Sequence, residues 1–183
     1  MMTTTRYTLT QRSLHWLIAL LVFGLLAIGL IFMTLGYDGT KEMFGDAITN
    51  DLYKYHKTFG IILFLLMILR VGLRFKSPPP AYEQALTGAE RVIGGGTHLL
   101  LYVLLLGLPI GGALATALSG YPVEFFNWNL PALVGENKAL GEQLFKLHGI
   151  AGLIVLALVV VHIAAAIKHW WLKDGIMQRI TLP

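Results

Sequence analysis

Long apolar runs separated by short polar stretches organise this chain of 183 residues. Four runs are long enough for helices that cross a membrane, which need about 20 predominantly apolar residues. The pattern predicts helices over residues 12–35, 51–75, 91–118 and 142–172. The chain is therefore predicted to be all-α, an integral membrane four-helix bundle that forms one domain over residues 1–183.

Composition agrees with a membrane protein and narrows its chemistry. Hydrophobic residues make up 56% of the chain and charged residues only 13%, whereas soluble domains carry about 25% charged residues. The chain has no cysteine, which excludes disulfides, iron–sulfur clusters, thiol catalysis and covalent haem attachment. A metal or cofactor would therefore be held non-covalently by histidine, carboxylate or methionine. No block of Lys and Arg suggests a nucleic-acid partner.

The distribution of charges predicts the orientation in the membrane. Cytoplasmic loops of membrane proteins carry an excess of Lys and Arg. With a cytoplasmic N-terminus, nine of the 14 basic residues lie at the inner ends of the helices, and seven of the 10 acidic residues at the outer ends. We therefore expect both termini in the cytoplasm. Residues 119–141 are expected to form a loop at the outer interface, with a short amphipathic helix.

Two histidines in the last apolar run, His148 and His162, are 14 residues apart. At 100° and about 1.5 Å per residue, they lie within about 40° of one helical face and roughly 21 Å apart along the axis. An imidazole inside a membrane is costly and usually functional. Two imidazoles at different depths therefore need a reason, which the other histidines supply.

Two further histidines match these two depths. In the predicted topology His15 lies near the inner start of the first helix, at the depth of His162. His56 lies near the outer start of the second helix, at the depth of His148. Each of the four has Ala or Gly four residues later, on the same helical face, where a flat ligand needs room. The sequence thus predicts two pairs, His15 with His162 and His56 with His148.

Two imidazoles from two helices at one depth suit a six-coordinate haem b, which needs no cysteine. Structural zinc instead needs four ligands that converge on one ion, and histidines 14 residues apart on one helix cannot do so. Two readings without haem stay open. The histidines could only pack and form hydrogen bonds between helices, or they could serve a histidine-based ion or proton transporter.

The motifs around these histidines resemble those of the bacterial cytochrome b561 family, small dihaem cytochromes of the inner membrane with four helices. The resemblance covers nearly the whole chain and implies that the two histidine pairs ligate two b haems. It also implies that ubiquinone exchanges electrons near the inner haem. The motifs that carry it are LHW at 14–16, YHKTFGI at 55–61, TGxxR at 87–91, GTHLLLYVLLLGLPIGG at 96–112, KLHGIAG at 146–152 and HIAAAIKHWWLKDGIMQRITLP at 162–183.

Four further residues are candidates for the same two sites. Arg70 and Arg74 gather at the inner face, where the guanidinium fork suits haem propionates, although the positive-inside rule explains their presence equally well. His169 matches a family histidine near the quinone site and would protonate a quinone oxygen with help from Lys168. Alternatively, His169 is a boundary histidine in an aromatic belt with the two tryptophans that follow it. No separate catalytic residue is expected.

The expected function is electron transfer across the membrane between a periplasmic donor and the ubiquinone pool. In some members of the family the outer haem is thought to take electrons from superoxide, which would make the chain a superoxide:ubiquinone oxidoreductase. The alternative is a haem b anchor or electron-transfer subunit of a larger respiratory dehydrogenase or hydrogenase. Expected partners are membrane lipid, ubiquinone and a small-molecule or protein donor, and the sequence leaves a homodimer open.

Overall fold

The computed structural model describes residues 6–182, most of which are helical. The long helices are α1 (Leu9–Lys76), α2 (Gly88–Leu118) and α3 (Lys138–Leu172), and each contains a segment long and apolar enough to cross a membrane. A hairpin of β1 (Val123–Phe125) and β2 (Trp128–Leu130) connects α2 to α3, and the short 3₁₀ helix η1 (Met177–Arg179) follows α3.

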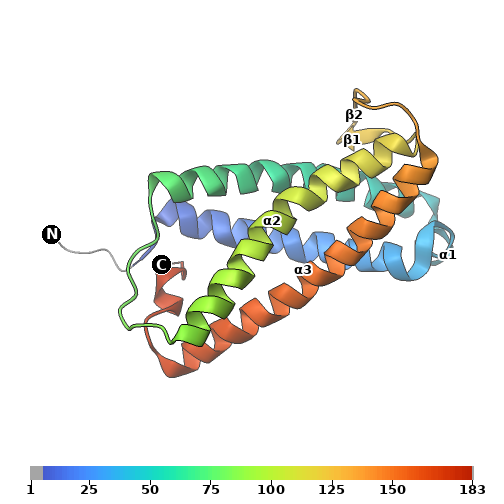
Figure 1. Cartoon of the computed structure of the whole chain (residues 1–183). Helices are drawn as coiled ribbons and strands as arrows, with labels where there is room; N and C mark the ends of the chain where they lie inside the picture. The colour runs from blue at the N-terminus through green and yellow to red at the C-terminus, as the bar shows by residue number, and fades with distance from the viewer. Residues whose placement is uncertain (1–5, 183) are drawn as a thin grey trace.

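The first two predicted helices are joined in α1, which bends back on itself (Figure 1). The backbone is non-helical at Gly36 (φ 64°) and Gly45 (φ 80°), and glycine adopts such angles without a steric cost. Between these two bends the chain keeps a helical conformation. Residues 36–50 were expected to be a non-helical connection between two helices. In the structure the backbone leaves the helical conformation only at Gly36 and Gly45.

The two arms of α1, residues 9–35 and 46–76, lie side by side. At one end, Gln11 Nε2 donates hydrogen bonds to the carbonyl oxygens of Leu73 at 3.4 Å and Ser77 at 2.9 Å. Near the other end, the rings of Phe32 and Tyr53 stack with centroids 3.8 Å apart. The two bends therefore produce an antiparallel hairpin of helices.

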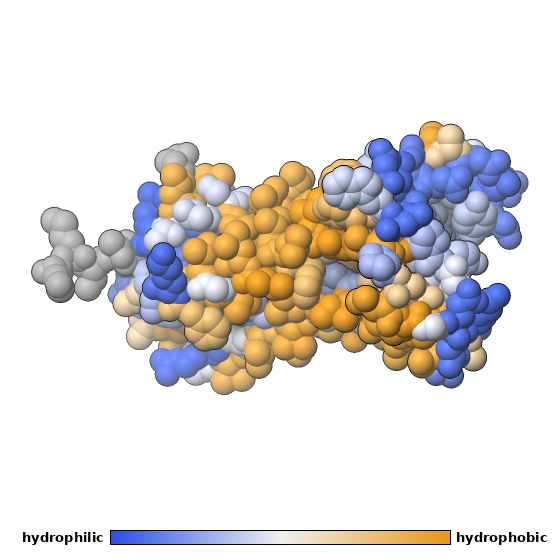
Figure 2. Space-filling model, turned by 90° about the horizontal axis from the view of Figure 1, so that it is seen from above, coloured by the Kyte–Doolittle hydropathy of each residue, from blue (hydrophilic) through white to orange (hydrophobic). Residues whose placement is uncertain are grey.

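The helices form an elongated bundle in which α2 packs mainly against α3 and also against α1 (Figure 1). On the face seen in Figure 2, hydrophobic residues cover the middle of the bundle and hydrophilic residues gather at both ends. Many large apolar side chains are exposed, as is typical of a surface that faces lipid. The small buried core contains Leu14, Ile18, Val22, Leu63, Met67, Leu105 and Val155.

The two ends of the described chain meet at one end of the bundle. The Tyr7 N–H donates to the Arg179 carbonyl at 3.1 Å, and an Arg12 Nη atom donates to the Thr181 carbonyl at 2.6 Å. The buried guanidinium of Arg179 lies 3.9 Å from the centre of the Tyr82 ring. These contacts tie the segment after α3 to the start of α1. That this end faces the cytoplasm stays a prediction.

Residues 119–141 contain a β-hairpin where we expected a short amphipathic helix. Phe126 and Asn127 form a two-residue turn with positive φ (55°) at Phe126, an angle that tight hairpins require. The Phe126 N–H donates to the buried hydroxyl of Thr58 on α1 at 2.9 Å. The expectation was wrong because aromatic and β-branched residues favour strands over helices, and the contact with α1 holds the turn in place.

Candidate functional site

Two pairs of histidines meet inside the bundle, one near each end. His15, on the first arm of α1, faces His162 of α3, and their ring centroids are 6.1 Å apart at an interplanar angle of 70°. The α2 residue His98 lies close to the same place, with its ring centroid 5.3 Å from that of His162. This inner site lies at the end where the two chain ends meet.

The outer pair repeats this geometry at the other end. His56, on the second arm of α1, faces His148 of α3 with ring centroids 6.2 Å apart at 72°. The Nδ1 atoms of both rings are buried. The His148 imidazole lies close to the backbone carbonyl of Leu108 on α2, whereas His56 Nδ1 has no hydrogen-bond partner within the described chain. Buried polar atoms normally have a partner, so the described protein leaves a polar group unsatisfied at His56.

Both spacings fit two imidazoles on opposite sides of one metal ion. An imidazole nitrogen binds a metal at about 2.0–2.1 Å, and the ring centre lies roughly 1.1 Å behind the nitrogen, so the centroids would be about 6.3 Å apart. Rings joined directly by an N–H···N hydrogen bond of about 2.9 Å would have centroids only about 5.1 Å apart. The measured 6.1 and 6.2 Å match the metal-bridged arrangement. Among residues 6–182, no three metal-binding side chains converge as a zinc site would need.

The helix α3 links the two sites. It is one continuous helix from Lys138 to Leu172, so the 14 residues between His148 and His162 separate the sites by roughly 21 Å. Beside the outer pair there is open space, because a Cβ added at Gly60 or Gly152 would meet no atom within 4 Å. These glycines follow the outer histidines by one helical turn, where a flat macrocycle would need room.

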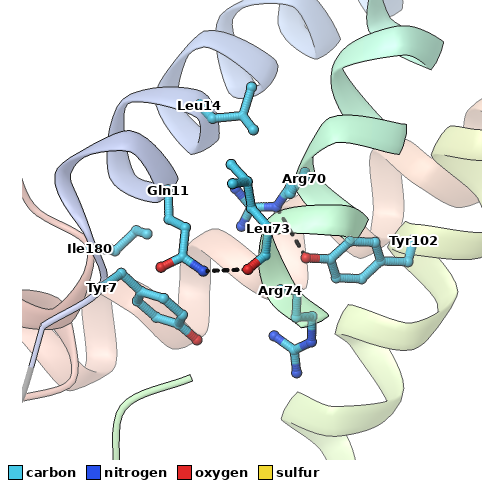
Figure 3. A pocket seen from close by; sticks show the side chains of 8 residues that line it. All are labelled: Tyr7, Gln11, Leu14, Arg70, Leu73, Arg74, Tyr102 and Ile180. Atoms are coloured by element: carbon cyan, nitrogen blue, oxygen red, sulfur yellow. Dashed lines mark hydrogen bonds between the residues drawn. The ribbon is translucent and has the colours of Figure 1, made fainter. Parts of the chain in front are cut away.

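Arg70 and Arg74 line a small pocket at the inner end of the bundle (Figure 3). Arg70 Nε donates to the Tyr102 hydroxyl at 3.2 Å, and the Arg74 guanidinium lies 5.9 Å from the centre of the Tyr102 ring. Only Nε of Arg70 is hydrogen-bonded within residues 6–182, so its terminal nitrogens can receive an anion. Arg70 lies close enough to His15 and His162 to act on both electrostatically, and Arg74 does so on His98.

His169 forms a pair with Asp174 that the sequence analysis missed. Its Nδ1 lies 2.5 Å from Asp174 Oδ2, and the two side chains are only 12% and 13% exposed. Burial opposes ionisation of the Asp174 carboxyl, but hydrogen bonds with His169 and the Ile176 N–H outweigh burial and lower its pKa. The signal in the sequence is a carboxylate two residues after the end of the last helix.

A cavity of about 420 Å³ lies next to this pair. Its size is that of sites for small molecules, about 300–1,000 Å³. Lys168 is not among its lining residues, and its Nζ lies 2.7 Å from Glu90 Oε1 on α2. That His169 and Lys168 act together on a quinone stays a prediction. The cavity is lined by His169, Trp170, Trp171, Lys173, Gly175, Met177, Gln178 and Thr181.

Lys54 and Lys57, which flank His56, are bound to carboxylates. Lys57 forms an ion pair with Glu124 and donates to the Pro122 carbonyl at 3.2 Å. Lys54 Nζ lies 2.8 Å from Asp51 Oδ1. These contacts place the β-hairpin next to the outer histidines and offset the positive charge there.

Comparison with known proteins identifies the family to which this geometry belongs. The sequence profile of the family described as prokaryotic cytochrome b561 matches residues 6–182. Cytochrome b561 homolog 2 of Escherichia coli K12 is 32% identical over 177 residues, covering 96% of this chain and 90% of the relative. Cytochrome b561 homolog 1 of the same organism is 26% identical, covering 96% of both chains. A probable superoxide oxidase, CybB of Yersinia pestis, is 26% identical and covers 96% of this chain and 95% of the relative.

Proposed function

Because this chain belongs to the prokaryotic cytochrome b561 family, we propose that it carries two b-type haems and moves electrons across the bacterial inner membrane to ubiquinone. His15 and His162 would ligate the inner haem, and His56 and His148 the outer one. The observation that carries the proposal is the pair of imidazole spacings, 6.1 and 6.2 Å, at two depths of one bundle. Haem binding and electron transport are properties of the family.

A bound haem would supply one-electron redox chemistry, and the protein would set its ligands, burial and surroundings. The histidines supply neutral nitrogen ligands from helices whose mutual positions are fixed by packing. Arg70 and Arg74 would neutralise haem propionates at the inner end, for which the free terminal nitrogens of Arg70 are suited. The helix α3 holds both sites at a constant separation, so the electron path has a fixed length.

The cavity beside His169 is the proposed place of ubiquinone reduction. Reduction of a quinone to a quinol takes two electrons and two protons, so a proton donor is needed at the ring oxygens. His169 Nε2 would deliver a proton, while Asp174, bound to Nδ1, orients the imidazole. Lys168 has no such role in this proposal, because Glu90 binds it.

Superoxide is the proposed donor on the outer side. The support is the name of the Yersinia pestis relative, a probable superoxide oxidase, which covers almost the whole chain. In the balanced reaction two superoxide anions lose one electron each to form two dioxygen molecules, and one quinone takes up both electrons and two protons. The ion pairs of Lys54 and Lys57 weaken the attraction of an anion, so we expect a modest dependence of the rate on salt.

The first test is haem content and pairing in purified protein. A pyridine haemochrome assay is expected to give two b haems per chain. His15→Ala and His162→Ala should remove the same spectral component, and His56→Ala and His148→Ala the other. Loss of one and the same haem in His56→Ala and His162→Ala would contradict the pairing. Colourless protein that moves ions across vesicle membranes would replace this proposal with the transporter.

The second test is turnover in the same preparation. Quinol formation driven by a superoxide source is expected in wild type and is expected to be lost in His56→Ala. Replacing superoxide with a chemical reductant should restore quinone reduction in that variant, because the inner site is intact. If haem is present but superoxide yields no quinol, a different donor or a partner dehydrogenase takes its place.

A further inference from the structure

The helix α2 lies close to the outer histidine pair at Gly112. A Cβ added there would lie 3.0 Å from Cε1 and 3.1 Å from Nδ1 of His148, but 3.8 Å from Nε2. Carbon atoms in ordinary contact are about 3.5–4.0 Å apart. The backbone of α2 therefore supports the His148 ring on its Nδ1–Cε1 side, and no side chain larger than hydrogen fits there without displacing the ring.

The backbone at Gly112 is itself held in place. The Gly112 carbonyl accepts a hydrogen bond from the buried Thr116 hydroxyl at 2.8 Å. The main interhelical contact of the bundle is the one between α2 and α3, and small residues let two membrane helices approach this closely. The steric overlap that an added methyl group would cause is therefore relieved by movement of the His148 imidazole rather than of either helix.

Other glycines of the bundle do not share this position. A Cβ at Gly111, the preceding residue of α2, would meet no atom within 4 Å. One at Gly29 would lie 3.7 Å from His56 Cε1, which is ordinary contact. Among residues 6–182, no glycine has His15 or His162 among the nearest neighbours of its added Cβ. The close contact is specific to one ring of the outer pair.

We propose that Gly112 is a positioning residue for the outer haem: its missing side chain sets the orientation in which His148 presents Nε2 to the iron. The inference rests on the proposed haem function and adds a determinant outside the four ligands. It acts on one site only. The inner haem, whose ligands have no such glycine neighbour, does not depend on it.

The test compares Gly112→Ala with the matched control Gly111→Ala in full-length protein. Both are placed in wild type and in a His15→Ala background, where the outer haem is the one retained. The measurements are haem per chain and the electron paramagnetic resonance spectrum of the ferric protein, because the low-spin signal depends on the orientation of the axial imidazoles. Gly112→Ala should shift the outer signal or reduce haem content from two toward one per chain. The inner signal, and both signals in Gly111→Ala, should match wild type.

Removal of the ring tests the cause. In Gly112→Ala/His148→Ala the methyl group no longer meets an imidazole, so this protein should retain the inner haem to the same extent as His148→Ala alone. If Gly112→Ala accumulates poorly and the double variant does not accumulate to the level of His148→Ala, the clash is not with His148 and the inference is wrong. An unshifted outer signal in a two-haem Gly112→Ala protein also overturns it. Wild-type protein without two haems would instead refute the proposed function.

Discussion

Replacement of Thr58 by valine tests how the β-hairpin is held over the outer site. Thr58 lies two residues after His56 and is fully buried, and its hydroxyl accepts the Phe126 N–H at 2.9 Å. Valine keeps the shape of threonine but cannot accept a hydrogen bond. The Phe126 N–H then has no partner while the hairpin stays docked.

The size of the effect follows from the loss of that partner. Leaving a buried donor unsatisfied costs about 1–3 kcal/mol. We expect the lower part of this range, about 1–2 kcal/mol, because the Lys57–Glu124 ion pair and the bond from Lys57 to Pro122 still hold the hairpin. Since 1.4 kcal/mol is a factor of ten in an equilibrium constant, local opening of the hairpin should increase roughly 5- to 30-fold.

Hydrogen exchange of the peptide that covers residues 121–131 measures this opening directly. Exchange of an amide that opens and closes rapidly follows the free energy of local opening. Thr34→Val is the matched control, since the Thr34 hydroxyl bonds only to the carbonyls of Leu30 and Ile31 in its own helix. Equal exchange of this peptide in Thr58→Val and Thr34→Val would refute the reasoning and show that the contacts of Lys57 are enough to anchor the hairpin.

Three further predictions concern packing, pH and the inner end. Met67 is 2% exposed, and Met67→Ala should lower the free energy of unfolding in mixed micelles by about 1–3 kcal/mol. This loss is smaller than in soluble cores because lipid also solvates the unfolded chain. The control Met33→Ala, at a residue 48% exposed, should change the free energy of unfolding by less than about 0.5 kcal/mol. The lowered pKa of Asp174 means that its carboxylate stabilises the fold above the ordinary value of 3.8. This contribution disappears as the pH falls through the folded pKa. When the pH is lowered from neutral to below about 4, the melting temperature of Asp174→Asn should therefore fall less than that of wild type. The rate of quinone reduction in Lys168→Met should stay within about twofold of wild type, whereas His169→Phe should lower it about 100-fold. An equal loss of rate in the two variants would show that Lys168 acts in the quinone site.

The sequence placed the long helices well because their main signal is local. The predicted segments 91–118 and 142–172 lie within α2 and α3, and 12–35 and 51–75 lie within the two arms of α1. The length of an apolar run and the presence of a breaker are read from consecutive residues. The connections were predicted less well. The turn-like residues 36–50 stayed mostly helical, and residues 119–141 became a hairpin whose turn depends on Thr58, far away in the sequence.

The candidate site divides in the same way. The depth of each histidine follows from the helical rise, and the structure accordingly places His15 beside His162 and His56 beside His148. The approach of His98 to His162 was not anticipated. Haem ligation by the two pairs stays a prediction that the variants above test.

The sequence by itself determined that this is an apolar helical protein with imidazoles at two depths, separated by 14 residues of one helix. These features follow from the rise and hydrophobic length of individual helices, which do not depend on neighbours. Only the tertiary structure decided that Asp174 binds His169, that Glu90 binds Lys168, and that Gly112 lies against His148. Such contacts depend on how each helix is rotated about its axis and how far its side chains reach, and no local pattern records either.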